Sequence, residues 1–306
     1  MCMKRDKQTP WKQLLTIWTT SFLLQDVICM VIYVVLLLPG FLQMAWFYVK
    51  TDRISVRYKA DSCRNSLDVY SNKSQQARPV VLFLPGGAFL IGYKMWAALL
   101  AQALAPAGIL VIAADYRNYP FGTVPDMVQD VEDVLEWTFE NCEVYGGDPK
   151  KVVLVGQSAG AHLGIMALLR RQWDIKGFIG LSGVYDLRDA TKLFGRHGLS
   201  AKFVKERLFD NRMTECDPTQ ILREEGKNLP LPPIEIWHGT ADKTVRHTLC
   251  VNLNVHVQIT TQRNCYSDRL AFFQTICIRI RAVQQQHPFQ GLSKLDTHRC
   301  HYRGHI

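Results

Sequence analysis

The run GQSAG at 156–160 most constrains how this chain can fold. A short β-branched run, 151–155, precedes it, and a helical pattern, 161–171, follows it. A serine between two glycines in this strand–turn–helix context is typical of a sharp turn that exposes the serine hydroxyl. The glycines lack a Cβ, so the chain can turn tightly and the helix can pack close to the strand. The pattern predicts Ser158 as a nucleophile; a Gly-rich turn with a serine N-cap is the alternative.

Continuous apolar runs alternate with helical patterns along the rest of the chain. Strands are expected at 79–84, 109–113, 151–155, 177–181 and 234–237, helices at 95–105, 126–142 and 161–171, and an antiparallel hairpin at 54–58 and 66–70. This alternation predicts an α/β fold with a mostly parallel sheet flanked by helices. Ligands of such sheets bind beyond the carboxyl ends of the strands. The polar segment 186–230 is expected to form a cap over that site.

Small residues follow the strand 79–84 and are expected to bind an oxyanion. Backbone N–H groups in such a loop can approach a carbonyl oxygen closely, and we expect those of Gly87, Ala88 and Ala159 to donate to it. Pro85 stands where these loops commonly have a histidine, which removes one hydrogen bond that positions the loop. The predicted oxyanion and substrate-binding residues are Gly86, Gly87, Ala88, Gln157 and Ala159. An ordinary turn at the end of the strand is the alternative.

A serine nucleophile of this kind requires an acid and a histidine base, in the chain order serine, acid, histidine. Asp242 follows the strand 234–237 and is the predicted acid; a solvated turn aspartate is the alternative. His298 is the candidate base among the histidines after Asp242. His162 lies one turn after Ser158 on the same helix, so we expect it to pack or to form a hydrogen bond. Two other aspartates that follow strands, less suitably placed, are Asp115 and Asp186.

The N-terminal region contains a long stretch without charge. The stretch from Val27 to Val49 has 23 residues, which span about 34 Å as a helix, against roughly 30 Å for a hydrocarbon core. Aromatic residues crowd its end at 46–48, as at a membrane interface. The sequence predicts a membrane anchor within residues 1–50, with a kink or a re-entrant hairpin at Pro39-Gly40. A secretory signal peptide and a buried core helix are the alternatives.

The net charge of +9 is unevenly distributed. Residues 246–306 carry eight Lys or Arg and two Asp, whereas residues 1–245 are nearly balanced. Without a basic stripe on an identifiable module, the charge argues against a nucleic-acid partner. Nine scattered cysteines include no C-x-x-C pair, which argues against zinc and favours reduced thiols. The expected organisation is an anchor at 1–50, an α/β domain at 51–245 and an atypical basic tail at 246–306.

Longer motifs resemble the isoprenylcysteine α-carbonyl methylesterase family, a membrane-bound branch of the α/β-hydrolase superfamily. The matching segments are LLLPGFLQMAWFY (36–48), RNSLDVY (64–70), GGAFLIGYKMW (86–96), DYRNYPFGTVPDMVQDV (115–131), YGGDPKKVVLVGQSAGAH (145–162), GLSGVYDL (180–187) and LPPIEIWHGTADKTV (231–245). The resemblance implies an α/β-hydrolase fold and hydrolysis of the methyl ester on a prenylated C-terminal cysteine through an acyl-enzyme. It implies no metal or organic cofactor.

The same resemblance implies the partners of the protein and its cellular setting. The partners would be a prenylated protein or prenylcysteine methyl ester and a lipid bilayer. The setting would be the endoplasmic reticulum or Golgi membrane, with the catalytic domain facing the cytosol. It assigns the nucleophile to Ser158, the acid to Asp242 and the oxyanion loop to residues 86–88.

The chain departs from this family after Val245. Family members continue with a further strand and a G-K-T-H-T motif that supplies the base, and this chain lacks that motif. The last strand of the sheet and the catalytic histidine therefore stay open. Two other functions stay open as well: a catalytically impaired membrane protein that binds prenylated or lipid ligands, and a broader carboxylesterase.

Overall fold

The computed structural model describes residues 38–71, 77–188, 195, 200–224 and 229–239, and the backbone of 257–262. The chain divides into two compact units, Met1–Lys50 and Thr51–Ile306. In the first unit residues 38–50 are helical, and the Lys50 ammonium lies 4.9 Å from the centre of the Trp46 ring. Within the described residues no helix combines the length and the apolar character that crossing a membrane requires. Of the predicted anchor, the part before residue 38 lies outside the described residues.

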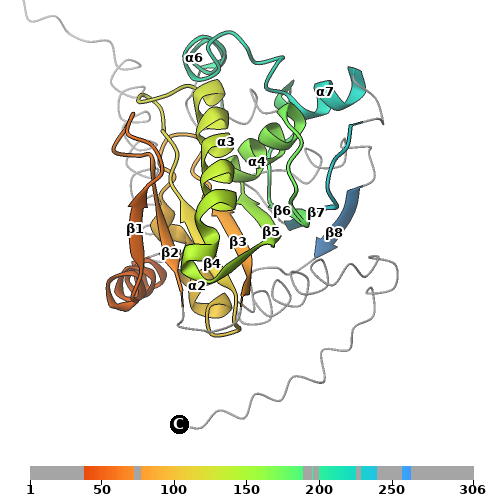
Figure 1. Ribbon diagram of the computed structural model, residues 1–306. Helices are drawn as coiled ribbons and strands as arrows, with labels where there is room; N and C mark the ends of the chain where they lie inside the picture. The colour runs from red at the N-terminus through yellow and green to blue at the C-terminus, as the bar shows by residue number, and fades with distance from the viewer. Residues whose placement is uncertain are drawn as a thin grey trace, which may run out of the picture. The chain divides into compact units, whose positions relative to one another are not determined.

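One sheet of eight strands forms the centre of the second unit, in the order β1-β2-β4-β3-β5-β6-β7-β8 (Figure 1). The strands are β1 (Ile54–Arg57), β2 (Ser66–Tyr70), β3 (Arg78–Leu84), β4 (Leu110–Ala114), β5 (Gly147–Gln157), β6 (Gly177–Leu181), β7 (Ile234–Gly239) and β8 (Val257–Gln262). The β1–β2 and β2–β4 pairs are antiparallel, and every other neighbouring pair is parallel. This confirms the predicted hairpin and the mostly parallel α/β sheet.

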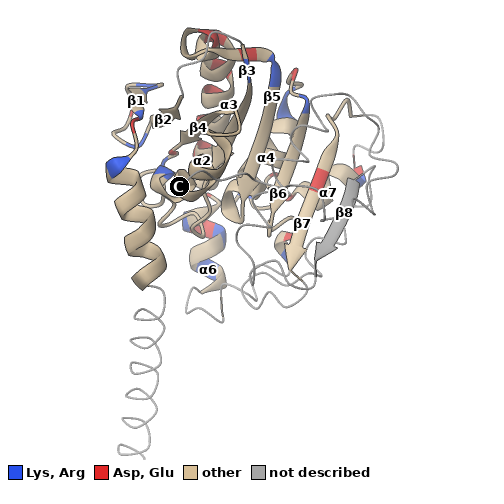
Figure 2. Ribbon diagram, turned by 90° about the horizontal axis from the view of Figure 1, so that it is seen from below, with Lys and Arg blue, Asp and Glu red and all other residues tan. Residues whose placement is uncertain are grey.

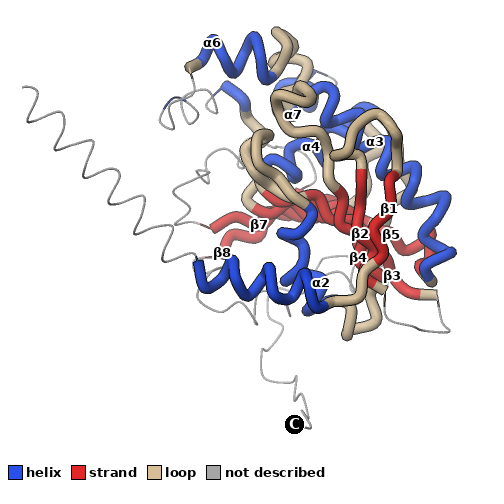
Figure 3. Tube along the Cα trace, turned by 90° about the vertical axis from the view of Figure 1, so that its left-hand side faces the viewer, coloured by secondary structure: helices blue, strands red, loops and turns tan. Residues whose placement is uncertain are grey.

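Helices cover both faces of the sheet, with α3 and α4 on one face and α2 on the other (Figure 3). The α-helices are α2 (Ala98–Leu104), α3 (Val124–Asn141), α4 (Ala159–Arg170), α6 (Ala201–Phe203) and α7 (Pro218–Glu224); single turns are η1 (Lys94–Ala97), η2 (Cys142–Tyr145) and the π-helical η3 (Val204–Leu208). Successive strand residues point to opposite faces. In β3, Val80 and Leu82 join the core of α3 and α4, whereas Val81 and Phe83 join that of α2. The charged residues of β5 accordingly lie in its first half, 147–151, and the remainder of that strand is uncharged (Figure 2).

The start of α3 shows how local chemistry sets an element's boundary. The helix begins at Val124, two residues before the predicted start at Asp126. Pro125 fits in the first turn because its missing N–H has no helical partner there in any case. The Thr123 N–H donates to the Asp126 carboxylate over 2.8 Å, which completes a capping box.

The strand β8 lies inside the predicted tail 246–306. Its backbone pairs in parallel with β7, in register from Ile234↔Val257 to Gly239↔Gln262. The sequence prediction had left the last strand open. The structure places this part of the tail at the edge of the sheet, where it covers the hydrogen-bonding groups of β7.

We expect a chain that ends at residue 256 to be less stable than one that ends at residue 262, because only the longer chain retains β8. Each net hydrogen bond contributes about 1 kcal/mol, and each lost kcal/mol lowers the melting temperature by about 2–4 °C in a domain of this size. Thermal denaturation followed by circular dichroism measures the difference. Equal melting temperatures would show that β8 does not stabilise the sheet.

Candidate active site

Ser158 occupies a strained turn between β5 and α4. Its φ of 49° and ψ of −113° lie in a region that residues with a side chain rarely adopt. The Ser158 N–H donates to the Leu181 carbonyl over 2.8 Å, and the Ser158 carbonyl accepts the N–H groups of Ala161 and His162 at 3.1 and 3.2 Å. These bonds fix the turn from both sides. The structure therefore holds Ser158, which is half-buried, in the strand–turn–helix position that the sequence predicts.

The glycine after the nucleophile brings the start of α4 against the end of β3. A Cβ at Gly160 would lie 2.6 Å from the Pro85 carbonyl oxygen and closer still to that of Leu84. Only glycine fits at this distance, because any side chain would collide with two backbone oxygens. The nucleophile and the residues that follow β3 are thereby packed backbone against backbone.

The loop between β3 and η1, residues 85–93, is called here the β3 loop, and it contains the predicted oxyanion donors. A Cβ at Gly86 would lie 3.0 Å from both the Ser158 Cβ and the Gln157 carbonyl oxygen. Three consecutive residues then have positive φ: Gly87 at 139°, Ala88 at 51° and Phe89 at 66°. The loop turns here, and the Leu90 and Ile91 N–H groups both donate to the Gly87 carbonyl.

The predicted oxyanion donors are available for a ligand. The N–H groups of Gly87 and Ala88 donate to no residue that the structure describes. Ala159 is the first residue of α4, so its N–H is one of the groups at a helix start that lack an intrahelical partner. Gly87 is half-buried and Ala88 is exposed. Backbone donors beside Ser158 are the arrangement that stabilises a developing negative charge on a substrate carbonyl oxygen.

His162 packs, as the sequence predicts, and is fully buried on α4. Its Nδ1 lies 2.8 Å from the Val184 carbonyl oxygen. Its ring meets the edges of Phe89 and Phe209, with centroids at 5.4 and 6.3 Å. Burial lowers the pKa of His162 to about 4, so the ring is neutral near pH 7 and Nδ1–H donates to Val184. The His162 ring thus packs α4, the helix that follows Ser158, against Phe89 of the β3 loop.

The described part of the predicted cap packs against the loops at this edge of the sheet. Phe203, in α6, contacts the ring of Tyr119 edge-on with centroids 5.2 Å apart. Phe209, after η3, is fully buried and contacts Phe89 at 5.9 Å. Because Phe89 belongs to the β3 loop and Tyr119 to the loop after β4, this segment borders the candidate site.

Two predicted catalytic residues, the acid Asp242 and the base His298, lie outside the described residues. Asp242 follows β7, which is parallel to β5 and separated from it by β6 alone. The two other aspartates considered are already engaged by basic groups. Asp115 contacts the Arg64 guanidinium at 3.3 Å and also accepts the Lys94 backbone N–H at 2.6 Å. Asp186 accepts from Nε and one Nη of Arg188 at 3.0 and 2.6 Å.

A mostly parallel sheet with a strained serine turn between β5 and α4 defines an α/β-hydrolase. Solved structures have the same fold. Esterase B from Lactobacillus rhamnosis, with a tributyrin phosphonate, superposes with a TM-score of 0.65 and 18% identity over 81% of this chain and 93% of that one. A truncated carbohydrate esterase from gut microbiota gives a TM-score of 0.62 and 19% identity over 76% and 97%.

The chain belongs to the BD-FAE family, whose profile matches residues 67–257. It is 37% identical to isoprenylcysteine alpha-carbonyl methylesterase ICME of Arabidopsis thaliana over 74% of this chain and 57% of that protein. The probable carboxylic ester hydrolase LipM of Mycobacterium tuberculosis (strain ATCC 25618 / H37Rv) is 29% identical over 59% and 46%. These comparisons confirm the family resemblance, and the relatives are named as ester hydrolases, the predicted enzyme class. The chain spans little more than half the length of the first of them.

We expect the protein to lose stability as the pH falls from about 6.5 towards 4. Unfolded His162 takes up a proton near pH 6.5, whereas the folded side chain does so only near pH 4. Protonation in this window therefore favours the unfolded state, by on the order of 3 kcal/mol at its acid end. Urea denaturation at pH 7 and at pH 4.5 measures the effect. The His162→Asn variant should show a smaller loss between the two pH values, and an equal loss would contradict the assignment.

Proposed function

We propose that this protein is a serine hydrolase that cleaves the C-terminal methyl ester of prenylated proteins. The observation that carries the proposal is the strained Ser158 turn with Gly86 packed against it, on an α/β-hydrolase sheet. The substrate class is supported by the Arabidopsis thaliana relative named isoprenylcysteine alpha-carbonyl methylesterase ICME, at 37% identity.

The reaction proceeds through an acyl-enzyme. The Ser158 Oγ attacks the ester carbonyl carbon while the base removes its proton, and the N–H groups of Gly87, Ala88 and Ala159 donate to the oxyanion. The C–O bond to the methoxy group breaks, and methanol leaves with the proton from the base. The base then removes a proton from water, which attacks the acyl carbon. The carboxylate product leaves, and the Ser158 hydroxyl is regenerated with that proton. These steps need no metal or organic cofactor.

Asp242 and His298 are proposed as the acid and the base of this reaction. Asp242 comes three residues after Gly239, the last residue of β7. Because the carboxyl ends of parallel strands lie at one edge of a sheet, this position favours an acid near Ser158. His298 follows Asp242 in the chain order that such a triad requires.

A lipid bilayer is the proposed setting, at the endoplasmic reticulum or Golgi membrane with the catalytic domain facing the cytosol. The uncharged segment 27–49 supports membrane attachment. A prenylated substrate stays at the bilayer, so an attached enzyme meets it in two dimensions. Extraction of membranes with carbonate, comparing the full chain with residues 51–306, tests the attachment.

A broader carboxylesterase is the second candidate, favoured by the similarity to LipM. The two candidates differ in what the pocket recognises. A prenylcysteine methylesterase has a much higher kcat/KM for a farnesylcysteine methyl ester than for the same ester without the prenyl group. A broader esterase hydrolyses both, and small aryl esters, at similar rates.

We expect a fluorophosphonate probe to label the wild-type protein and not the Ser158→Ala variant. Phosphonylation requires an activated serine hydroxyl, and the substitution removes it. Labelling is measured by mass spectrometry of the modified peptide. A folded wild-type protein that remains unlabelled would contradict the hydrolase proposal and would favour a ligand-binding role.

Ser182 offers a matched control for this experiment. It also has a φ of 49° directly after a strand, β6, and its N–H donates to the Trp237 carbonyl over 2.8 Å. Because Ser182 does not sit at the start of a helix beside the β3 loop, the Ser182→Ala variant should be labelled like the wild type. If it too loses labelling, the loss reports damage to the fold and not the nucleophile.

The Gly86→Ala variant is expected to hydrolyse esters roughly 10-fold more slowly at unchanged KM. The added Cβ would lie 3.0 Å from the Ser158 Cβ, so the nucleophile or the β3 loop must shift by a few tenths of an ångström. Reaction geometry is sensitive to such shifts. Steady-state kinetics measure the change, and an unaltered kcat would show that Gly86 does not border the reacting atoms.

A further inference from the structure

A second loop holds the β3 loop in place. It joins β4 to α3 and comprises residues 115–123, called here the β4 loop. Three hydrogen bonds connect them: Tyr116 Oη to the Pro85 carbonyl (2.7 Å), Asn118 Nδ2 to the Gly92 carbonyl (2.7 Å) and the Tyr119 N–H to the Phe89 carbonyl (2.9 Å). They are distributed over the length of the β3 loop, so both its start and its end are fixed.

The Tyr116 hydroxyl supplies a hydrogen bond to the start of the β3 loop, where Pro85 itself cannot donate one. Pro85 has no N–H, and its side chain cannot donate where a histidine commonly would. The Tyr116 ring is fully buried, and burial raises the pKa of its hydroxyl, which therefore stays protonated and donates to the Pro85 carbonyl. A Cβ at Gly92 would lie 3.0 Å from the Tyr116 Oη and 2.8 Å from the Gly86 carbonyl oxygen. The hydroxyl is thus enclosed by the β3 loop.

The far end of the β3 loop is fixed by the first residue of the β4 loop. The Asp115 carboxylate accepts the Lys94 N–H at 2.6 Å. Arg64 reaches the same carboxylate at 3.3 Å and also donates to the Gly92 carbonyl. Lys94 is itself positioned by an ion pair, because its ammonium lies 2.7 Å from the buried carboxylate of Asp68 in β2.

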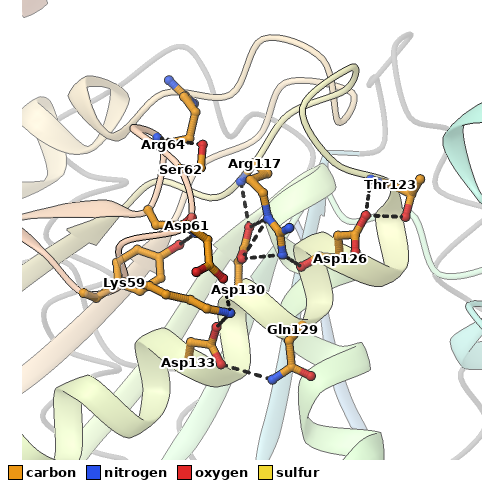
Figure 4. Close-up of polar contacts among 12 residues, drawn as sticks. Lys59, Asp61, Ser62, Arg64, Arg117, Thr123, Asp126, Gln129, Asp130 and Asp133 are labelled. Carbon is orange, nitrogen blue, oxygen red and sulfur yellow. Dashed lines mark hydrogen bonds and ion pairs between the residues drawn. The ribbon is translucent and has the colours of Figure 1, made fainter.

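The β4 loop is itself fixed to α3 by a buried ion pair (Figure 4). The Arg117 guanidinium contacts both carboxylate oxygens of Asp130 at 2.9 Å, and the Arg117 N–H donates to the same carboxylate at 2.9 Å. A further bond joins the guanidinium to the Asp126 carbonyl at 3.2 Å. Asp130 is fully buried. A planar guanidinium held through Nε and one Nη has a fixed orientation, so the pair restricts the position of the loop.

A second ion pair lies beside the first on α3 and does not touch the β4 loop. The Lys59 ammonium, from the β1–β2 connection, lies 2.9 Å from Asp133 and 2.8 Å from Asp61 (Figure 4). Asp133 is one turn along α3 from Asp130. Lys59 therefore provides a control of the same kind, on the same helix, without a bond to either loop.

We propose that the β4 loop is the scaffold of the oxyanion donors Gly87 and Ala88, with Tyr116, Arg117 and Asn118 as positioning residues for ester hydrolysis. The proposal rests on the proposed function and adds the residues that set the geometry of the donors. Oxyanion donors act only within about 2.7–3.1 Å of the charge that develops. Tyr116 and Asn118 fix the carbonyls on either side of Gly87 and Ala88, and Arg117 fixes the loop from which they act.

Steady-state kinetics with a farnesylcysteine methyl ester test the proposal in Tyr116→Phe, Asn118→Ala and Arg117→Met. We expect kcat to fall by roughly 10- to 100-fold in each variant at nearly constant KM, because small displacements of donors slow the chemical step. Arg117→Lys should recover only part of kcat, since an ammonium cannot form the bidentate pair. Lys59→Met should retain the wild-type kcat. Melting temperatures establish that each variant is folded.

Hydrogen exchange provides a measurement that does not depend on turnover. Peptides that cover residues 85–94 should exchange faster in the three β4-loop variants than in the wild type and in Lys59→Met. Unchanged kcat and unchanged exchange in folded Tyr116→Phe and Asn118→Ala would overturn the proposal, as would equal effects in Lys59→Met. If the wild type hydrolyses no ester, the proposed function fails, and exchange at 85–94 alone decides whether the scaffold exists.

Discussion

The candidate site depends on a backbone contact between the end of β3 and the start of α4. Gly160 lies against the Leu84 and Pro85 carbonyls, at a distance that excludes any side chain. Pairing of β3 with β5 continues to Leu84↔Gly156, directly before the serine turn. Ser158 and the start of the β3 loop are therefore positioned directly by the sheet, and the β4 loop fixes the rest of the β3 loop.

The main contribution of the buried charged side chains around the site is to position backbone segments of the loops. Breaking an ion pair such as Arg117–Asp130 leaves an uncompensated buried charge, whereas the intact pair adds little net stability over apolar packing. The pair matters for geometry, because the hydrogen bonds that a guanidinium donates to a carboxylate have fixed directions. The same holds for Asp115, which is buried beside the β3 loop and accepts the Lys94 N–H. The polar residues of this region thus restrict a loop in which three of the nine residues are glycines.

The sequence predicts the Ser158 turn and the strands β1 to β7, because each is marked by a pattern of neighbouring residues. In the sequence, DYRNYPFG is recognisable only as a shared motif, and its structural role is missed, since the partners of Tyr116 and Asn118 are backbone carbonyls 31 and 26 residues away. No residue type marks such a carbonyl. The sequence also leaves the last strand open, although the β-branched sequence VQITTQ of β8 offers a signal.

The sequence by itself determined which segments become the strands β1 to β7 and the helices α2, α3 and α4, and that Ser158 lies at a turn between two glycines. Apolar periodicity and the missing Cβ of glycine are properties of neighbouring residues, so they can be recognised without the fold. Only the tertiary structure decided the strand order and which loops meet. Strand order follows from pairing between distant segments, and the support of the β3 loop by Tyr116, Arg117 and Asn118 exists only once β3 and β4 are neighbours in register.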